Sequence, residues 1–327
     1  MANIILHPDW YIPESFATPE SAFLNRRRFL ASMGMAGAGL MSTAGIGCAK
    51  DEPAPATKPA AGTAASSKYP AKRNPQFNSK LELTKEEAAA SLNNFYEFFP
   101  NRAADIRKLT GKFVTSPWPI EIKGLVDKPM TVDAAELVSM FDLEERVYRF
   151  RCVEAWAMIV PWTGFPLSKL IEKASPKAEA KFVRFETFNR PDQAPGMART
   201  LNSYPWPYFE GLRMDEALHP LTMVVTGIYG KPLPKQHGAP IRIIVPWKYG
   251  YKSIKSIVKM EFIDKQPKIF WEALQPAEYP FESNVDPSLP HPRWSQATER
   301  LIDSGDRVKT LPYNGYGDDV AKLYAKK

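Results

Sequence analysis

A run of alternating side chains at residues 147–156, Val-Tyr-Arg-Phe-Arg-Cys-Val-Glu-Ala-Trp, places the tightest constraint on how the chain folds. A strand sends successive side chains to opposite faces, so this alternation predicts a strand that runs through residue 153. A thiol and a carboxylate beside aromatic rings, just before a turn-prone run, make a candidate site. One predicted face carries Tyr148, Phe150, Cys152 and Glu154, and the other carries Arg149 and Arg151.

The composition fits a globular protein with a large core. Of the 327 residues, 44% are hydrophobic and 12% are aromatic, which suits one large domain or two small ones. The net charge is +7, but Lys and Arg are dispersed among acidic residues, so the pattern argues against nucleic-acid binding. With 31 prolines and 18 glycines, we expect many rigid loops between short elements.

The N-terminus has the pattern of an export signal. Residues 25–30 read Asn-Arg-Arg-Arg-Phe-Leu and precede an uncharged, glycine-rich apolar run at residues 31–47. A basic segment before an apolar one is typical of a signal peptide, and these paired arginines resemble the twin-arginine type. The run is too short and glycine-rich for a membrane span. We expect residues 1–48 to direct export to the periplasm through the twin-arginine machinery, the alternative being an ordinary N-terminal helix.

The two cysteines of the chain have different settings. Cys48 ends the expected signal and is either an acylated lipid anchor or a residue near a simple cleavage point; Gly45 stands where a lipidation motif prefers an aliphatic residue. Residues 49–80, rich in Ala, Pro, Ser and Lys, are expected to be a disordered linker. Cys152 then lacks a disulfide partner in an oxidising compartment, a liability that burial or ligation removes.

The folded body is expected over residues 81–327. Thr84 followed by Glu87 is a capping-box pattern, which predicts a helix that runs into residues 93–98. The two asparagines there are either a helix end beside core aromatics or part of a site.

Later elements follow from the same rules. Further helices are expected from Asp133 to Phe141, at residues 167–173 and as one turn at residues 214–217, with a loop at residues 161–167. Strands are expected at residues 118–132 (strand, turn and strand), 182–188, 221–229, 241–245 and 257–263, the last being the final clear strand.

A second group of site-like residues occupies residues 236–255. His237 and Arg242 flank a proline turn, and Lys248, Lys252, Ser253 and Lys255 surround Gly250. Cationic side chains, a hydroxyl and backbone N–H groups that glycine leaves accessible can all donate hydrogen bonds to a phosphate. The pattern is not a Walker loop, which argues against dedicated ATP binding. The alternative is a solvated, lysine-rich hairpin.

Five blocks resemble, in order and spacing, the catalytic subunits of periplasmic protein-methionine-sulfoxide reductases, which are molybdopterin enzymes with the sulfite oxidase fold. The resemblance runs from about Asn93 to the C-terminus. The blocks are Asn-Asn-Phe-Tyr-Glu-Phe (93–98), Arg-Cys-Val-Glu-Ala-Trp (151–156), Gly-Ala-Pro-Ile-Arg (238–242), Val-Pro-Trp-Lys-Tyr-Gly (245–250) and His-Pro-Arg-Trp-Ser-Gln-Ala-Thr-Glu-Arg (291–300).

The resemblance implies a fold and a cofactor. The fold is α+β: a β-rich, mixed molybdopterin-binding domain of the sulfite oxidase type with peripheral helices. The proline-broken segment after residue 263 implies that the C-terminal dimerisation domain of sulfite-oxidising relatives is lacking and that the subunit is a monomer. The cofactor is molybdenum-molybdopterin without a nucleotide. No haem is expected in this chain, which has no Cys-x-x-Cys-His motif.

The resemblance also implies the site residues. Cys152 is the thiolate ligand of molybdenum, a soft donor that suits a metal held by pterin sulfurs. His237 stands where some relatives have asparagine, and the loop cations are expected near the pterin phosphate. The implied cofactor-binding residues are Asn93, Asn94, Tyr96, Glu97, Thr187, His237, Arg242, Ser253, Ile254 and Lys255.

The implied reaction removes oxygen from methionine sulfoxide residues of periplasmic proteins and so repairs them. Glu154 is the candidate for proton supply or for shaping the pocket; the alternative is a salt bridge to a nearby arginine. Electrons are expected from a haem-containing membrane subunit. Two other functions remain open: a sulfite-oxidising enzyme of the same fold, and a tethered periplasmic binding or scaffold protein in which Cys152 is simply buried.

Overall fold

The computed structural model describes residues 68–78 and 81–325. They belong to a compact unit, Pro59–Lys327. The expected export signal at residues 1–48, Cys48 and most of the expected linker lie outside the described residues. In the described part of the chain, no helix is long and apolar enough to cross a membrane.

The expectation of a disordered linker up to residue 80 is wrong for its last part. Strand β1 (Lys72–Asn78) pairs in parallel with β4 (Glu144–Arg151). The strand is polar, which is why its composition resembles a linker, yet Phe77 packs edge-to-face on Tyr148 with ring centroids 6.3 Å apart. Arg73 also forms an ion pair with Glu145 at 2.7 Å. An aromatic contact with the buried Tyr148, an ion pair and a backbone ladder therefore order a segment that lacks an apolar pattern.

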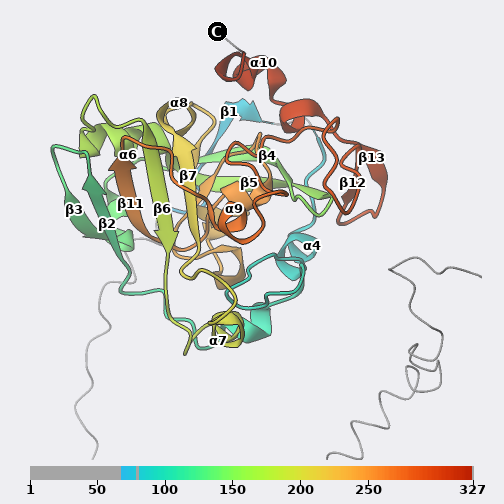
Figure 1. Ribbon diagram of the computed structural model, residues 1–327, viewed down its shortest axis with the longest axis horizontal. Coiled ribbons are helices and arrows are strands. Elements are labelled where there is room, and N and C mark those ends of the chain that lie inside the picture. The colour runs from blue at the N-terminus through green and yellow to red at the C-terminus, as the bar shows by residue number, and fades with distance from the viewer. Residues whose placement is uncertain (1–67, 79–80, 326–327) are drawn as a thin grey trace, which may run out of the picture. The chain divides into compact units, whose positions relative to one another are not determined.

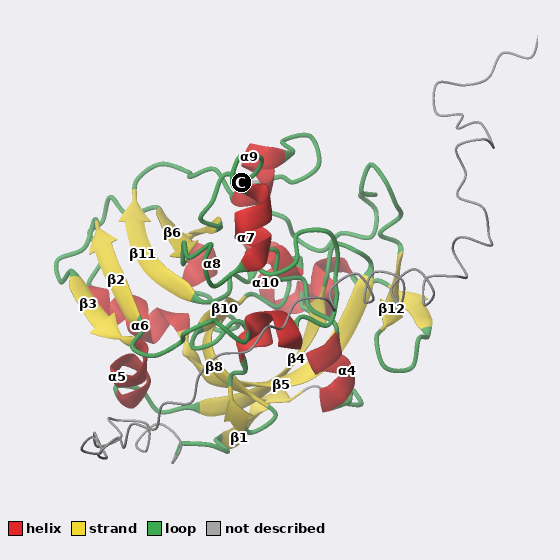
Figure 2. Ribbon diagram, turned by 90° about the horizontal axis from the view of Figure 1, so that it is seen from below, coloured by secondary structure: helices red, strands yellow, loops and turns green. Residues whose placement is uncertain are grey.

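The smaller of two mixed sheets holds five strands in the order β3-β2-β11-β6-β7. β2 runs parallel to β11, and the other neighbours are antiparallel. Figure 2 shows β3, β2 and β11 together on the left of the view. The strands are β2 (Pro119–Gly124), β3 (Met130–Asp133), β6 (Phe182–Thr187), β7 (Phe209–Arg213) and β11 (Ile257–Ile263).

The larger sheet has eight strands, built around the long β5 (Trp156–Pro166). β4 is antiparallel to β5 along one edge; on the other edge β12 pairs with the beginning of β5 and β8 with its end. Figure 1 shows β4 and β5 running toward β12 and β13 on the right of the view. The remaining strands are β8 (Met223–Ile228), β9 (Lys231–Pro232), β10 (Arg242–Ile244), β12 (Thr298–Leu301) and β13 (Arg307–Lys309).

The helices are short and flank the sheets, which confirms the α+β class. In α5, the Asp133 side chain accepts a hydrogen bond from the N–H of Ala135 at 2.9 Å and caps the helix as expected. The helices are α4 (Glu86–Ser91), α5 (Ala134–Ser139), α6 (Leu167–Ala174), α7 (Pro195–Thr200), α8 (Met214–Ala217), α9 (Phe270–Leu274) and α10 (Gly317–Val320).

The predicted capping box at Thr84 is wrong. The Thr84 hydroxyl instead accepts a hydrogen bond from the backbone N–H of Ile159 in β5, at 2.9 Å. Helix α4 begins at Glu86 and ends at Ser91, so the Asn-Asn-Phe-Tyr-Glu-Phe block lies in a loop after the helix. A tertiary hydrogen bond has replaced the local one that the sequence pattern predicts.

The loop expected at residues 161–167 is also wrong, because residues up to Pro166 continue β5. This strand is buried along almost its whole length and therefore shows no alternation. Gly164 does not mark a turn: a Cβ at this position would lie 2.0 Å from the carbonyl oxygen of Val224 on the paired strand. The glycine is needed for close approach of two backbones.

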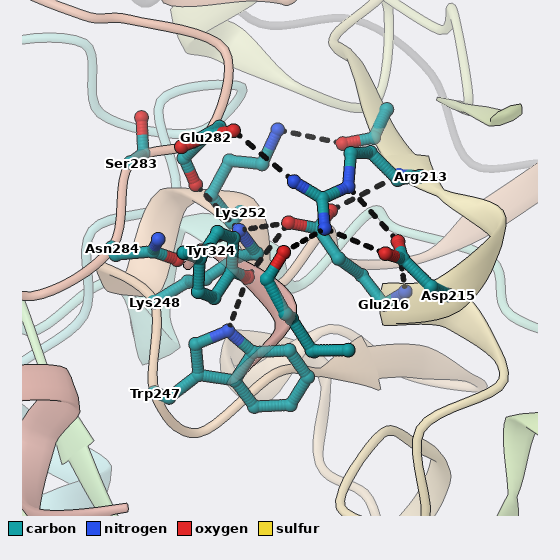
Figure 3. Close-up of polar contacts among 12 residues, drawn as sticks. Arg213, Asp215, Glu216, Trp247, Lys248, Lys252, Glu282, Ser283, Asn284 and Tyr324 are labelled. Carbon is teal, nitrogen blue, oxygen red and sulfur yellow. Dashed lines mark hydrogen bonds and ion pairs between the residues drawn. The ribbon is translucent and has the colours of Figure 1, made fainter. Parts of the chain in front are cut away.

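The expectation that residues 257–263 form the last clear strand is wrong, because two short strands follow β11. β12 and β13 form a hairpin that joins the larger sheet. Near the C-terminus, the Tyr324 hydroxyl donates to Glu216 Oε1 at 2.7 Å and accepts from Trp247 Nε1 at 2.8 Å. Figure 3 shows Lys248 converging on the same carboxylate, at 2.6 Å. This buried network fastens the C-terminal segment to the core.

Candidate functional site

Cys152 lies in the tight turn between β4 and β5. β4 ends at Arg151, so the prediction of a strand through residue 153 is wrong by two residues. The N–H of Cys152 donates to the carbonyl of Trp156 at 2.9 Å, and Ala155 takes a positive φ of 59° to close the turn. Glu154 therefore shares the thiol's surroundings through the turn and not through strand alternation.

The Cys152 thiol is buried, with 6% of the residue exposed. Its sulfur accepts hydrogen bonds from Asn94 Nδ2 at 3.1 Å and from the N–H of Glu154 at 3.4 Å. Burial raises the pKa of Cys152 to about 12, and the charge of Glu154 raises it further, against the two hydrogen bonds. Protein groups alone therefore leave the thiol protonated, and a bound cation would be needed to hold the thiolate.

The thiol opens onto a cavity of about 510 Å³. Segments far apart in the sequence meet there: the loop after α4, the Cys152 turn and the segment around Gly250. Nearly all the predicted site residues line the cavity, namely Asn93, Asn94, Tyr96, Glu97, Cys152, Glu154, His237, Arg242, Ser253, Ile254 and Lys255.

Thr187 is the predicted site residue that the structure does not bring to the cavity. It is buried at the end of β6, where its hydroxyl donates to the carbonyl of Ser256 at 2.9 Å. Ser256 directly follows Lys255, so Thr187 supports the cavity wall from behind.

Two titratable side chains, Glu97 and Lys255, line one side of the cavity, and the charge of each affects the other. Burial raises the pKa of Glu97 to about 7 and lowers the pKa of Lys255 to about 7. Lys255 Nζ donates to the carbonyl of Asn94 at 2.7 Å, which ties this lysine to the loop after α4. A Cβ at Gly196 would lie 2.3 Å from the carbonyl oxygen of Tyr96, so α7 packs directly on the backbone of the same loop.

Arg242 forms the cationic wall. Its Nη1 and Nη2 donate to the carbonyls of His237 and Ser253 at 2.9 and 2.8 Å, but its buried Nε has no partner among the described residues. Burial lowers the pKa of His237 to about 3, with Arg242 and Lys255 adding to the effect, so the imidazole is neutral. A neutral ring beside Arg242 and Lys255 leaves the local charge positive, which suits an anionic group.

Two of the lysines expected near the pterin phosphate, Lys248 and Lys252, do not line the cavity. Lys248 Nζ lies 2.6 Å from Glu216 Oε1, and Lys252 Nζ lies 2.9 Å from Glu210 Oε2. All four side chains are almost completely buried. The alternative of a solvated lysine-rich hairpin is therefore wrong, and so is a phosphate role for these two lysines.

The sequence prediction missed the aromatic part of the cavity wall. The segment at residues 291–296 is fastened to the Cys152 turn, because Trp294 Nε1 and Gln296 Nε2 both donate to the carbonyl of Val153 at 2.8 Å. The block at residues 291–300 is the sequence signal that points to this part of the wall. The missed lining residues with aromatic or cationic side chains include Tyr204, Tyr208, Trp271, Tyr279, Arg293 and Trp294.

The cavity fits a pterin-held metal. Asn94 Oδ1 and Arg242 Nε are buried without hydrogen-bond partners among the described residues, so these two polar atoms of cavity-lining residues are available to a bound ligand. Within residues 68–78 and 81–325, no group of three or more His, Cys, Asp and Glu side chains could hold a metal ion. A metal bound at Cys152 would therefore need most of its ligands from a cofactor, and soft sulfur ligands from a pterin would match the thiolate.

Comparisons with known proteins agree with this chemistry. The family model described as "Oxidoreductase molybdopterin binding domain" matches residues 108–271. Sulfane dehydrogenase SoxCD from Paracoccus pantotrophus, a solved structure, gives a TM-score of 0.40 and 20% identity over 47% of this chain and 40% of that chain. At that score, the likeness is too weak to bear on function.

Relatives named "Protein-methionine-sulfoxide reductase catalytic subunit MsrP" match far more closely. Those of Xanthomonas campestris pv. campestris and Xanthomonas axonopodis pv. citri are 46% identical, with 96% of this chain and 95% of theirs covered. That of Burkholderia mallei is also 46% identical, over 96% of this chain and 93% of its own. Similarity at this level along nearly the whole of both chains means that this chain belongs to the family of protein-methionine-sulfoxide reductase catalytic subunits, which are molybdopterin-binding oxidoreductases.

Proposed function

We propose that this protein removes the oxygen of methionine sulfoxide residues in other proteins, at a molybdenum-molybdopterin centre bound in the cavity. The observation that carries the proposal is the Cys152 thiol, buried at the cavity and held by Asn94, in a chain that matches these reductases over 96% of its length. The bound cofactor would supply a two-electron redox change coupled to oxygen-atom removal.

The residues of the cavity divide into three roles. Cys152 is the proposed thiolate ligand of the metal. Arg242 and Lys255 provide positive charge for the anionic part of the pterin, and the neutral His237 offers a hydrogen bond beside them. Additional contacts to the cofactor are assigned to Asn93, Asn94, Tyr96, Glu97, Ser253 and Ile254, all at the cavity, with Thr187 acting indirectly through Ser256.

Glu154 is the proposed source of one proton. Reduction of a sulfoxide breaks the S–O bond, adds two electrons to sulfur and adds two protons to oxygen, giving a thioether and water. Glu154 lines the cavity, where its Oε2 accepts a hydrogen bond from Trp156 Nε1 at 3.2 Å. The alternative role, a salt bridge with an arginine, has no support among the described residues, since Arg149 and Arg151 both pair with Glu299.

We further propose the setting in which the enzyme works. The twin-arginine pattern supports export of the folded holoenzyme to the periplasm, where oxidised proteins would be repaired, with lipid attachment at Cys48 as the alternative to simple cleavage. A haem-containing membrane subunit would donate electrons, since the chain has no haem-attachment motif. The catalytic subunit would be a monomer, and the pterin would carry no nucleotide.

The test compares metal content with both directions of oxygen transfer. Protein purified from a host grown with molybdate should contain molybdenum and reduce methionine sulfoxide with a reduced viologen dye. Cys152→Ala should lose that activity. Faster oxidation of sulfite with an electron acceptor would instead identify a sulfite-oxidising enzyme. Folded protein without molybdenum would indicate a binding or scaffold protein.

A further inference from the structure

Tyr279 stands in the cavity wall with a phenol group that the roles above do not use. It is 5% exposed and lines the same cavity as Cys152. Its oxygen lies 3.3 Å from His291 Nε2 and 3.4 Å from Arg293 Nη2. His291 also lies 3.2 Å from Glu278 Oε2, and Arg293 lies 2.7 Å from the same oxygen.

These hydrogen bonds determine where the phenol hydrogen points. His291 Nδ1 accepts from the N–H of Arg293 at 3.2 Å, so a neutral ring carries its hydrogen on Nε2, toward Tyr279 and Glu278. The guanidinium of Arg293 can only donate. Neither neighbour can therefore accept from Tyr279, because His291 Nε2 carries its hydrogen, which also faces Glu278 at 3.2 Å, and Arg293 only donates. The phenol hydrogen has no acceptor among the residues that the structure describes. That hydrogen is free for a ligand in the cavity.

The support for Tyr279 is rigid and is joined to the thiol. His291 stacks on Trp294 with ring centroids 3.8 Å apart, and Trp294 donates to the carbonyl of Val153, next to Cys152. Burial raises the pKa of Tyr279 to about 12, with charges at Glu278 and Cys152 adding to the effect of burial against that of Arg293. The phenol therefore stays protonated across the working pH range and can serve as a donor.

We propose that Tyr279 is a catalytic residue that donates a hydrogen bond, and then its proton, to the sulfoxide oxygen of the substrate. The inference rests on the proposed function. As the S–O bond breaks and sulfur takes up two electrons from the external donor, the oxygen receives one proton from Tyr279 and one from Glu154 and leaves as water. The Tyr279 phenolate, held by hydrogen bonds from its neighbours, regains its proton from water that enters the cavity after the product leaves. Arg293 and His291 are positioning residues.

Tyr279→Phe tests the proposal, because it removes the hydroxyl and keeps the ring. Tyr249→Phe is the matched control, because Tyr249 is also a buried tyrosine, 8% exposed, and does not line this cavity. Three quantities are measured on molybdenum-loaded protein: kcat and KM for methionine sulfoxide with a viologen donor, and the affinity for methionine sulfone, which is not reduced. Sulfone binding is followed by fluorescence of the cavity tryptophans.

We expect kcat of Tyr279→Phe to fall by about 10²-fold, the usual effect of losing a general acid. Sulfone affinity should fall by about 3- to 10-fold, the effect of one neutral hydrogen bond. Molybdenum content should be unchanged, and Tyr249→Phe should match the wild type. His291→Gln, which keeps a donor near the Tyr279 oxygen, should retain more kcat than His291→Leu.

Two outcomes would overturn the inference: kcat and sulfone affinity of Tyr279→Phe within about twofold of wild type, or loss of molybdenum from this variant, which would show a structural role. Failure of the wild-type, molybdenum-loaded protein to reduce methionine sulfoxide would instead overturn the proposed function, so the two failures are distinguishable.

Discussion

Replacement of Lys248 by methionine should destabilise the protein strongly, although the sequence suggests a phosphate-binding loop. Lys248 Nζ is completely buried, 2.6 Å from Glu216 Oε1, and donates to the carbonyl of Glu282 and to Asn284 Oδ1 at 2.7 and 2.9 Å (Figure 3). Lys248→Met leaves the Glu216 carboxylate buried without its cation. Breaking a buried pair in this way costs about 3–5 kcal/mol.

The assay is urea unfolding of the molybdenum-loaded protein, followed by tryptophan fluorescence at constant pH and salt. The matched control is the double variant Lys248→Met with Glu216→Gln, in which no charge is left unpaired. It should recover about 1–3 kcal/mol relative to the single variant, the coupling expected for residues in contact. A cost of the single variant below about 1 kcal/mol would refute a structural role for this pair. Loss of molybdenum without loss of stability would show that Lys248 binds the cofactor after all.

Three further outcomes are expected from unfolding measurements. Below about pH 6.5, the free energy of unfolding should fall by up to about 1.4 kcal/mol per pH unit, because only the unfolded state then binds a proton at His237. His237→Asn should remove this pH dependence. An unchanged pH dependence in the variant would show that His237 is not its source. Gly164→Ala should cost about 3 kcal/mol, because the added Cβ meets the Val224 carbonyl, and a neutral effect would argue against the close approach. Ala155→Gly should stabilise the Cys152 turn by about 0.5–1 kcal/mol, since φ is 59°, and a loss of stability would show that the turn is unstrained.

The sequence was a good guide where a local rule coincided with the tertiary environment. The alternating strand β6, the strand β11 and the Asp133 cap of α5 are observed as expected. Local rules failed where a distant segment took the polar group, as at Thr84, which bonds to Ile159. They also failed in β5, where burial on both faces removes alternation and Gly164 serves close packing.

In the candidate site, too, some residues could be predicted from the sequence and others depend on tertiary contacts. Cys152 and Arg242 were recognisable because the blocks that carry them resemble a known family, and the fold brings both to the cavity. Residue type alone could not separate Lys255, which reaches the cavity, from Lys248, which a buried glutamate holds away from it. Tyr279 had no local signal, since its role depends on His291 and Arg293, which only tertiary contacts bring to its hydroxyl.

The central claim is that Cys152 supplies a thiolate to a pterin-held molybdenum, and X-ray absorption at the molybdenum edge tests it most directly. Wild-type protein and Cys152→Ser, both loaded with molybdenum, are compared for the number of sulfur neighbours and for methionine sulfoxide reduction. The variant should show one sulfur neighbour fewer than the wild type and should be inactive. An equal number of sulfur neighbours in both proteins, or a fully active variant, would contradict the claim.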